Sequence, residues 1–599
     1  MSTHPLEIPE ILFLLSKYLP RQDQLNCLKV SKSFHSIFIS EIWRTIRVEK
    51  RDRDIWDWSP NLSNGRIYPV DYRRPYSSTN ITRNITRSSY LTGSTYLTGN
   101  PYLTGNIYPI ISTYPTGSAL QRNKHHIQEI VFFNDYPQEY FLLRDCLRLR
   151  AVTIHHPTSL NRGYTQASQR LWERYIFMSF AILVSAHTST IQNVTLDFYM
   201  DALASPPMEI WDALNQCPKL DQLYLSTLRV SPNHTPSFFQ ACSKAQSLTL
   251  KFVAILDFPR ESDENPINYI NCDRLQEVKI IRAVEYIPFE CDTPYSQARM
   301  LRRFHNLRSL DYRFEGDKQY SPTPSVCATN FFRTIIQGSW ILHQLENLNF
   351  ASAQIGDALL AEVLGKMHRI RSLNVSDTSF GHLSLQALLN DAPVNSGLSS
   401  ATGNLQRWKL CGFIETLNIR HCKNISGAMI QTILESCPQL TQLLAERISI
   451  DEIARGKAWV CKNMRTMKLY LSAELNPGPD IAEKQHIAYT QLAKLTKLRE
   501  LNLTEGDSLK NCERRTLDLR VKEGLSLLAG LNELCVFSFL YDPYQQMEIA
   551  EAHWMIANWP SLNYFLGVVN QEPCTREAFA AILCSKNITA SNSFSPLRQ

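Results

Sequence analysis

The stretch that most constrains the fold lies at residues 413–444 and reads FIETLNIRHCKNISGAMIQTILESCPQLTQLL. Its first half alternates apolar and polar side chains, as a β-strand with one buried face does. Its second half repeats apolar residues every three or four positions, the period of a helix, at Ile430, Ile433, Leu434 and Cys437. Ser426 is suited to cap this helix and Pro438 to end it. We therefore expect Leu417, Ile419, Ile433 and Leu434 to be buried, with Cys437 at a helix end.

The strand half of this pattern returns along the chain from residue 127 onward. Its first apolar position falls at Ile127, Leu149, Ile191, Leu220, Ala245, Leu275, Leu307, Leu345, Ile370, Ile414, Leu440, Met464, Leu498, Leu531 and Leu562. One strand and one helix in about 26 residues is the length and pattern of a leucine-rich repeat. The sequence predicts an α/β solenoid of about fifteen irregular leucine-rich repeats.

The cysteines support this register. Those that lie three residues before a first apolar position are Cys146, Cys217, Cys242, Cys272, Cys437 and Cys461, and Trp559 takes the same place in the last unit. A small apolar side chain suits the junction where a helix turns into the next strand. The chain thus resembles the cysteine-containing leucine-rich repeats, and Cys422 matches that family's cysteine or asparagine position beyond the strand.

Length and composition limit the remaining classes. A chain of 599 residues exceeds one ordinary core, and a net charge of +6 is too weak to indicate nucleic-acid binding. The 15 cysteines show no C-x-x-C pair, so we expect reduced thiols in a cytoplasmic or nuclear protein. No apolar run reaches the roughly 18 residues of a membrane span, and no signal peptide is recognisable.

Residues 1–46 form a separate predicted module. Three short helices are expected there, with Asp23 as the cap of the second, and about 40 residues bury too little surface to be stable without a partner. The segment resembles an F-box, with Ile8-Pro9 in place of Leu-Pro, then Glu10-Ile11, Tyr18-Leu19 and Val30. It departs from that motif in its shortened Pro-to-Glu step and in Phe34, where Trp is common.

An F-box binds a Skp-type adaptor and through it a cullin. By this resemblance the adaptor-binding residues would be Ile8, Pro9, Ile11, Leu12, Leu15, Leu19, Leu25, Leu28, Val30 and Phe34. The alternative is a helical cap that shields the first repeat, since solenoids need polar-faced ends.

The remaining boundaries follow from composition. Residues 47–123 carry a repeated Tyr-Leu-Thr-Gly motif and few large aliphatic side chains, which predicts a disordered linker and insertion. The solenoid is expected over 124–584 and a polar tail over 585–599.

No motif for catalysis, a cofactor or a metal occurs, so we expect a non-enzymatic protein with none of these sites. What remains is the outward face of the strands. In a solenoid these positions line the concave side, where exposed aromatic and charged residues suit protein binding. The predicted target-binding residues are Tyr224, Lys251, Lys279, Asp311, Arg313, Arg420, Lys468 and Tyr470.

By its resemblance to F-box proteins with leucine-rich repeats, the chain looks like a substrate receptor of a cullin-type ubiquitin ligase, and we expect no role for nucleic acid or membrane. A repeat scaffold unrelated to ubiquitin is the alternative, and an enzyme hidden in the insertions is a distant third.

Overall fold

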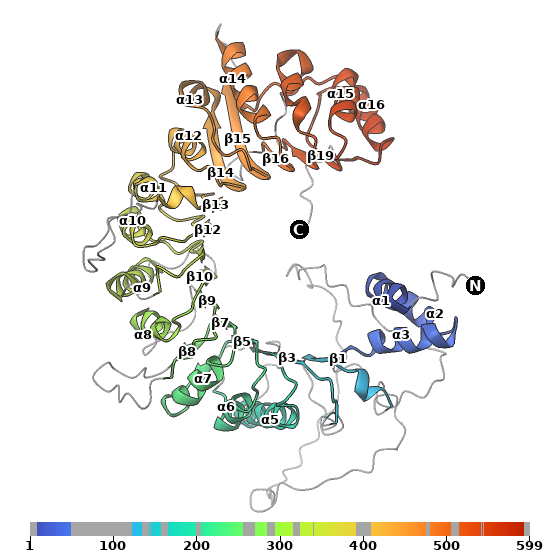
Figure 1. Ribbon diagram of the computed structural model, residues 1–599, viewed down its shortest axis with the longest axis vertical. Helices are drawn as coiled ribbons and strands as arrows, with labels where there is room; N and C mark the ends of the chain where they lie inside the picture. Colours follow the sequence, from blue (N-terminus) through green and yellow to red (C-terminus); the bar gives the residue numbers. More distant parts are fainter. Residues whose placement is uncertain are drawn as a thin grey trace, which may run out of the picture. The chain divides into compact units, whose positions relative to one another are not determined.

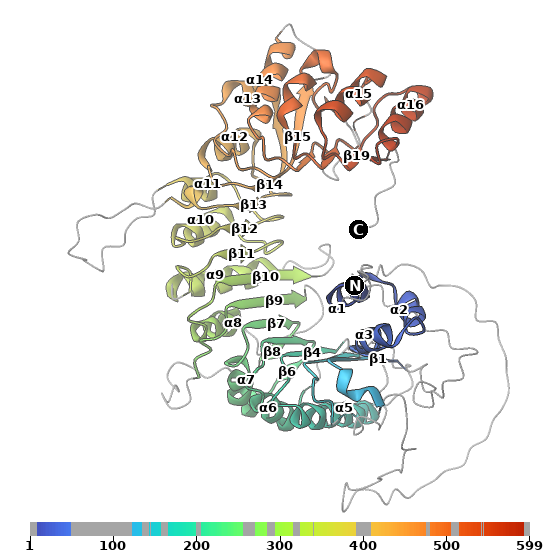
Figure 2. The same cartoon turned by 45° about the vertical axis from the view of Figure 1, so that its right-hand side comes forward.

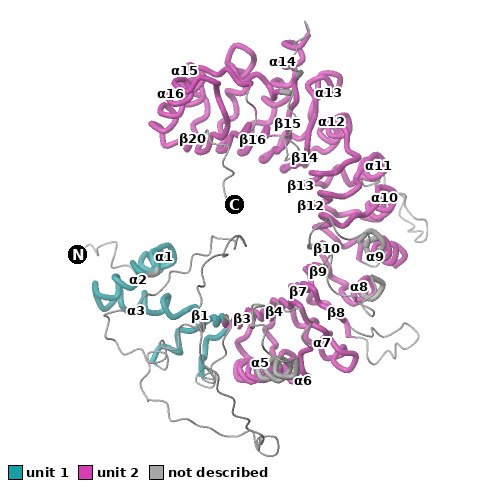
Figure 3. Tube along the Cα trace, turned by 180° about the vertical axis from the view of Figure 1, so that it is seen from behind, with its two compact units in different colours: residues 1–131, 137–149, 597–599 teal, residues 132–136, 150–596 magenta. Residues whose placement is uncertain are grey.

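A computed structural model gives the structure of the chain, which divides into two units. It describes residues 9–49, 122–133, 143, 145–156, 166–198, 205–255, 270–283, 294–315, 324–338, 341–390, 409–474, 480–504, 514–540, 542 and 544–591. Unit one comprises residues 1–131, 137–149 and 597–599, and unit two comprises 132–136 and 150–596 (Figure 3). Ile8, most of the predicted linker and residues 592–599 of the predicted tail lie outside the described residues.

Unit one contains the predicted helical module. Its elements are α1 (Pro9–Tyr18), α2 (Arg21–Cys27), α3 (Lys32–Ile42), β1 (Thr45–Glu49), η3 (Lys124–His126) and the first part of β2 (Glu129–Phe133). Helix α3 packs against both α1 and α2, and the helices bury Leu12, Phe38 and Ile42. The buried Gln24 amide joins α2 to the end of α1, because its Nε2 donates to the backbone oxygen of Ser16 at 2.6 Å.

The prediction that Asp23 caps the second helix is wrong. Helix α2 begins at Arg21, with Pro20 in the N-cap position at φ −55° and ψ 149°. This extended proline lets the helix start at the next residue, so Asp23 falls in the first turn. A carboxylate there still interacts favourably with the helix dipole.

Unit two is built on a parallel sheet. Among its described residues the strands follow one another in the order β3 (Ala151–His156), β4 (Asn193–Phe198), β5 (Gln222–Ser226), β7 (Ser247–Lys251), β9 (Glu277–Ala283), β10 (Ser309–Glu315), β11 (Asn347–Asn349), β12 (Ser372–Asn374), β13 (Thr416–Asn418), β14 (Gln442–Ser449), β15 (Thr466–Glu474), β16 (Glu500–Asn502), β18 (Val536–Ser538), β19 (Tyr564–Leu566) and β20 (Thr589–Ser591). Two short strands, β6 (Arg229–Val230) and β8 (Ala254–Ile255), pair beside them.

Helices cover one side of this sheet, as Figures 1 and 2 show, and we call the opposite side the inner face. The helices are α5 (Gln166–Ala186), α6 (Met208–Asn215), α7 (Thr235–Cys242), α8 (Pro294–Met300), α9 (Pro324–Gly338), α10 (Asp357–Gly365), α11 (His382–Leu389), α12 (Gly427–Ser436), α13 (Ile450–Arg455), α14 (Ile481–Ala493), α15 (Ile549–Asn558) and α16 (Pro573–Cys584). Short 3₁₀ turns stand at η5 (Pro232–His234), η8 (Leu301–Arg303), η9 (Leu410–Gly412), η10 (Val521–Glu523) and η11 (Leu525–Gly530).

The strands are aligned leucine against leucine. Leu417 pairs with Leu373 on one side and with Leu443 on the other, and all three are fully buried. Every predicted first apolar position is buried, and so are Ile419, Ile433 and Leu434, as expected. Ser426 caps α12 by accepting a hydrogen bond from the Met429 N–H at 3.3 Å. Unit two is therefore a solenoid of leucine-rich repeats.

One predicted register is wrong by three residues. The sequence pattern placed a first apolar position at Leu531, but the aligned strand residue is Phe537, which pairs with Leu501. Leu534 therefore stands at the first apolar position, and Leu531 takes the place before it. All three side chains are fully buried, so burial alone could not distinguish the two registers.

The cysteine positions are confirmed. Cys437 is the C-cap of α12, and the six cysteines that lie three residues before a first apolar position are all buried. Cys411, which the sequence pattern left out, lies three residues before Ile414 and is also buried. Trp559 is the C-cap of α15 and donates from its indole nitrogen to the backbone oxygen of Leu528 at 2.9 Å.

A left-handed turn follows several strands at the same repeat position. The residues with positive φ there are Thr227 (55°), Phe252 (54°), Ser352 (59°), Asp377 (59°) and His421 (58°). Such angles are costly for residues other than glycine. Hydrogen bonds to the next repeat hold them: the N–H of Asp377 donates to the Arg420 carbonyl at 2.7 Å, and the first three make the equivalent bond at 2.8–2.9 Å.

The repeats change form at β14. Strands β14 and β15 have 8 and 9 residues, against 3 in β11, β12 and β13. The far end of β15 pairs antiparallel with β17 (Arg514–Arg515). A chain segment thus returns across the end of the sheet between two repeats.

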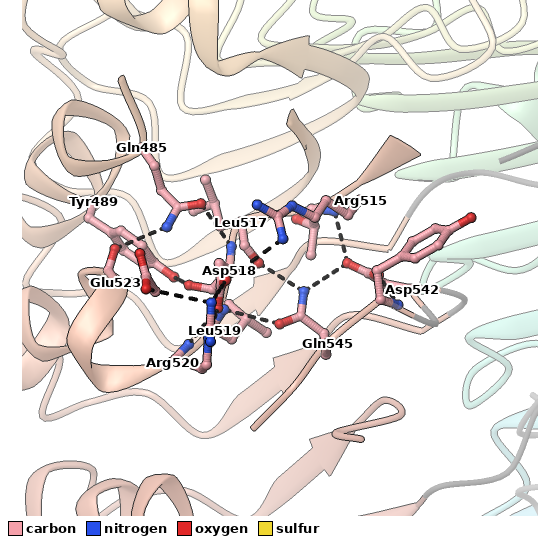
Figure 4. A network of polar contacts seen from close by, with 12 residues as sticks. Gln485, Tyr489, Arg515, Leu517, Asp518, Leu519, Arg520, Glu523, Asp542 and Gln545 are labelled. Carbon is pink, nitrogen blue, oxygen red and sulfur yellow. Dashed lines mark hydrogen bonds and ion pairs between the residues drawn. The ribbon is translucent and has the colours of Figure 1, made fainter. Parts of the chain in front are cut away.

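Buried side chains anchor this returning segment (Figure 4). The Asp518 N–H donates to Gln485 Oε1 at 2.9 Å, and Tyr489 Oη donates to the Asp518 carbonyl at 2.7 Å. Gln545 accepts from the Leu519 N–H at 3.0 Å and donates to the Leu517 carbonyl at 2.8 Å. Side chains thus replace the backbone partners that a regular strand would supply.

Candidate functional site

The sheet register places the predicted target-binding residues on the inner face. Along the ladder, Tyr224 stands level with Thr249, then come Lys279, Asp311, Asn349, Asn374, Asn418, Leu444, Lys468 and Asn502. The next outward row holds Lys251 and Arg313, and Arg420 follows β13. The inner face is thus a continuous surface built from many repeats.

A first group of charges lies on β3, β4 and β7. His155 Nδ1 is 3.0 Å from Asp197 Oδ2, across neighbouring strands. Burial alone would raise the pKa of Asp197, but hydrogen bonds from His155 and Ser226 and the charge of Lys251 together lower it. Predicted target residue Lys251 therefore has an acidic neighbour within the protein.

A second group lies on β9 and β10. Arg313 Nε is 2.8 Å from Asp311 Oδ1, and Lys279 on the neighbouring strand adds a second positive charge. Burial nonetheless raises the pKa of Asp311 above its usual value, against the opposing effect of Arg313 and Lys279. These three predicted target residues thus come together, and the Asp311 carboxylate offsets one of their two positive charges.

The last group of predicted residues is divided by the structure. Lys468 on β15 forms an ion pair with Glu500 on β16 at 2.7 Å. Tyr470 is only 3% exposed, so the prediction that it is an exposed inner-face aromatic is wrong. Strand β14 bulges between Leu444 and Arg447, and the register shift brings Arg447 opposite Tyr470. A strict two-residue alternation cannot anticipate that shift.

The helical module presents an apolar surface that overlaps the predicted one at Leu15 and Val30. The large apolar side chains that stand exposed on it are Phe13 (44%), Leu14 (54%), Leu15 (37%), Tyr18 (83%) and Val30 (65%). We call these five residues the apolar patch. Phe13, Leu14 and Tyr18 were not among the predicted adaptor residues, which followed a stripe that includes the buried Leu12.

Leu12, predicted to contact an adaptor, is fully buried and therefore belongs to the module's core. The side chains of Ile11, Leu19, Leu25, Leu28 and Phe34 are half-buried. Pro9 begins α1, as expected of a proline at a helix start. Leu28 and Val30 follow α2 instead of lying within it.

The cysteines that lie three residues before a first apolar position have thiols of low reactivity. Burial raises the pKa of Cys146 and Cys272 to about 12, and that of Cys217 and Cys461 to about 11. Since the thiolate is the reactive form, these thiols are poor nucleophiles at neutral pH. Their positions agree with a packing role at the helix ends.

Over the described ranges, no group of three or more His, Cys, Asp or Glu side chains could hold a metal ion. Within the same ranges, no helix is both long and apolar enough to cross a bilayer.

Comparison with known proteins finds similarity among solved structures and none among family models or curated sequences. No family model matches the sequence, and no curated protein sequence does. Among solved structures, a leucine-rich-repeat protein of Leptospira interrogans is similar at 13% identity with a TM-score of 0.40, over 79% of this chain and 97% of that one. An internalin of Listeria monocytogenes is similar at 11% identity with a TM-score of 0.30, over 79% of this chain and 89% of that one. The assignment of the fold therefore rests on the parallel register and the repeat pattern.

Proposed function

We propose that this chain is the target-binding subunit of a cullin-type ubiquitin ligase. The helical module would bind a Skp-type adaptor, and the inner face of the solenoid would hold the target protein. The adaptor and the cullin would then bring a ubiquitin-charged enzyme close to lysines of the target. In this role the chain positions its partners and makes no bond itself.

The observation that carries this proposal is the apolar patch. The three short helices bury Leu12, Phe38 and Ile42 between them, and the five patch residues stay exposed. A module this small has little apolar surface to spare, and an exposed apolar cluster on it is typical of a partner site. Each large side chain buried on binding supplies roughly 1.5–3 kcal/mol, so a few of them suffice to anchor a partner.

One observation favours the alternative, a repeat scaffold whose helices only cap the solenoid. The chain runs directly from α3 into β1, and the Arg44 carbonyl accepts from the N–H groups of Gln128 and Glu129 at 2.9 and 3.0 Å. Thr45 Oγ1 also donates to Glu129 Oε2 at 3.0 Å. A cap would be tied to the neighbouring strand in this way.

Adaptor binding separates the two functions. A purified Skp-type adaptor should bind the full chain, and Leu14→Ser with Tyr18→Ser should weaken binding at least tenfold while the circular dichroism spectrum stays unchanged. The matched control is Leu383→Ser, an exposed leucine on α11, which should bind the adaptor normally. No adaptor binding by the unaltered chain would favour the scaffold.

A further inference from the structure

Asparagines occupy one inner-face position in three successive strands. Asn349, Asn374 and Asn418 stand level on β11, β12 and β13. Each side-chain Oδ1 accepts the backbone N–H two residues further on, at 3.1, 3.1 and 3.2 Å. This bond uses the amide oxygen and fixes the side chain, so the Nδ2 group is left as the donor.

The three Nδ2 groups differ in their hydrogen-bond acceptors. The amide of Asn349 donates to the Asp311 carboxylate. For Asn374 and Asn418 no acceptor for Nδ2 lies within the described residues, and both side chains are partly exposed. Two oriented donors on neighbouring strands therefore face the solvent side of the sheet, roughly 5 Å apart at the strand spacing.

Two arginines beside these asparagines also stand out. Most basic inner-face residues have an acidic neighbour, as Lys468 has Glu500. Over the part of the chain that the structure describes, Arg420 and Arg447 have no carboxylate within ion-pair distance. Arg420 lies two residues beyond Asn418, and Arg447 lies on the next strand, β14. The guanidinium groups of Arg420 and Arg447 thus carry positive charge with no carboxylate partner among the described residues.

We propose that the inner face from β12 to β14 binds an extended, acidic peptide segment of a partner protein. The Nδ2 groups of Asn374 and Asn418 donate to carbonyl oxygens of the segment, and the guanidinium groups of Arg420 and Arg447 pair with its Asp or Glu side chains. This inference rests on the proposed function in one respect, since it gives the chemical class of the target that the inner face would hold.

A peptide fits this surface better than a nucleic acid. Glu446 on β14 is paired with His421, and among the described residues Arg420 and Arg447 are the two basic side chains here without a carboxylate partner. Binding of a continuous phosphate chain depends on many basic contacts. Two guanidinium groups match a short segment with one or two carboxylates.

The test uses the full chain and a fluorescent decapeptide of alternating Glu and Ala, with the matching Gln and Ala peptide as the neutral probe. The Glu peptide should bind and the Gln peptide should bind at least fivefold more weakly. Arg420→Gln with Arg447→Gln should weaken binding of the Glu peptide at least tenfold, since the loss of even one charged hydrogen bond is worth about that factor. Asn374→Asp with Asn418→Asp should also weaken binding of the uncharged Gln peptide, which the added carboxylates do not repel, because Asp keeps the backbone bond and removes the donor.

The matched control is Arg465→Gln. Arg465 is exposed and lies just before β15 begins, and this variant should leave peptide binding unchanged. Equal binding by all variants, or no binding of the Glu peptide by the unaltered chain, would overturn the proposal. Tighter, Arg420-dependent binding of a single-stranded oligonucleotide would overturn the peptide class. Adaptor binding, measured on the same preparations, reports on the ligase function separately, because the adaptor would use the apolar patch.

Discussion

The backbone N–H of His421 donates to the side chain of Glu446, with 2.7 Å between nitrogen and Oε1. In four other repeats the equivalent N–H, that of Asp377 for example, donates to a backbone carbonyl of the next repeat. His421 Nδ1 lies 2.9 Å from the same Glu446 oxygen. Glu446 thus completes the left-handed turn with its side chain, where the four other repeats use a backbone carbonyl.

Glu446→Ala should therefore expose the His421 N–H and destabilise the turn by about 0.5–1.5 kcal/mol, the net value of a hydrogen bond near the surface. Hydrogen exchange at the His421 amide should become faster in this variant. Glu446→Gln keeps the acceptor oxygen and should retain most of the protection. Unchanged exchange in Glu446→Ala would mean that the turn does not depend on this bond.

Leu417→Ala should destabilise the central repeats by roughly 2–5 kcal/mol, because the fully buried side chain would leave a cavity between aligned leucines. The damage should spread mainly to the neighbouring repeats, since each repeat contacts only those beside it. Thermal unfolding measures the loss of stability, and hydrogen exchange of the native protein measures how far the damage spreads. Leu383→Ala, which shortens an exposed leucine, is the control and should melt as the unaltered chain does; a similar melting temperature for both variants would contradict the assigned core.

Gln545→Leu should destabilise the segment returning from β17 by about 2–4 kcal/mol. The buried amide accepts from the Leu519 N–H and donates to the Leu517 carbonyl, and a leucine would leave these two backbone groups without partners. Proteolysis of the native protein should then begin near residue 517. Gln546→Leu, at an exposed neighbouring position, should leave the digestion pattern unchanged.

Asp197→Asn should reduce stability at neutral pH and not in acid. The pKa of Asp197 is lower than usual in the folded protein, so its ionised form stabilises the fold above the unfolded pKa. That contribution is lost as the pH falls through the folded pKa, so the two melting temperatures should converge below about pH 4. Asp212→Asn, at an exposed site on α6, should leave the pH profile unaltered. A difference that is constant from pH 7 to pH 3 would contradict this linkage.

The repeat register could be predicted because it depends on local alternation and on helix ends. Leu417 and Cys437 are where the pattern placed them, since apolar period and turn residues act over a few positions. The error at Leu531 arose because the first apolar position, Leu534, is also a leucine and lies three residues after Leu531. Local pattern offers no way to choose between two apolar residues in the same phase.

The inner face was harder to predict because its details come from neighbouring strands. Tyr470 is buried although it alternates with the partly exposed Lys468, and Gln545 acts on a segment more than 20 residues away in the sequence. Lys279 and Arg313 appeared as separate binding residues, and only the register shows that they meet at Asp311. In unit one, a helix as short as α1 has apolar residues on more than one side, so the sequence did not identify the face that packs on α3.

The Glu446 contact also determines where this protein can be shortened for experiments. A fragment that stops after β13 would lose the acceptor of the His421 N–H, and one that stops within β14 would lose the Ser449 capping box that starts α13. A fragment that ends after Arg455 keeps both, with α13 complete. Deletion boundaries chosen by counting repeats from the sequence would cut through this junction, and fragments ending at residue 455 should express and fold better than those ending at residue 440.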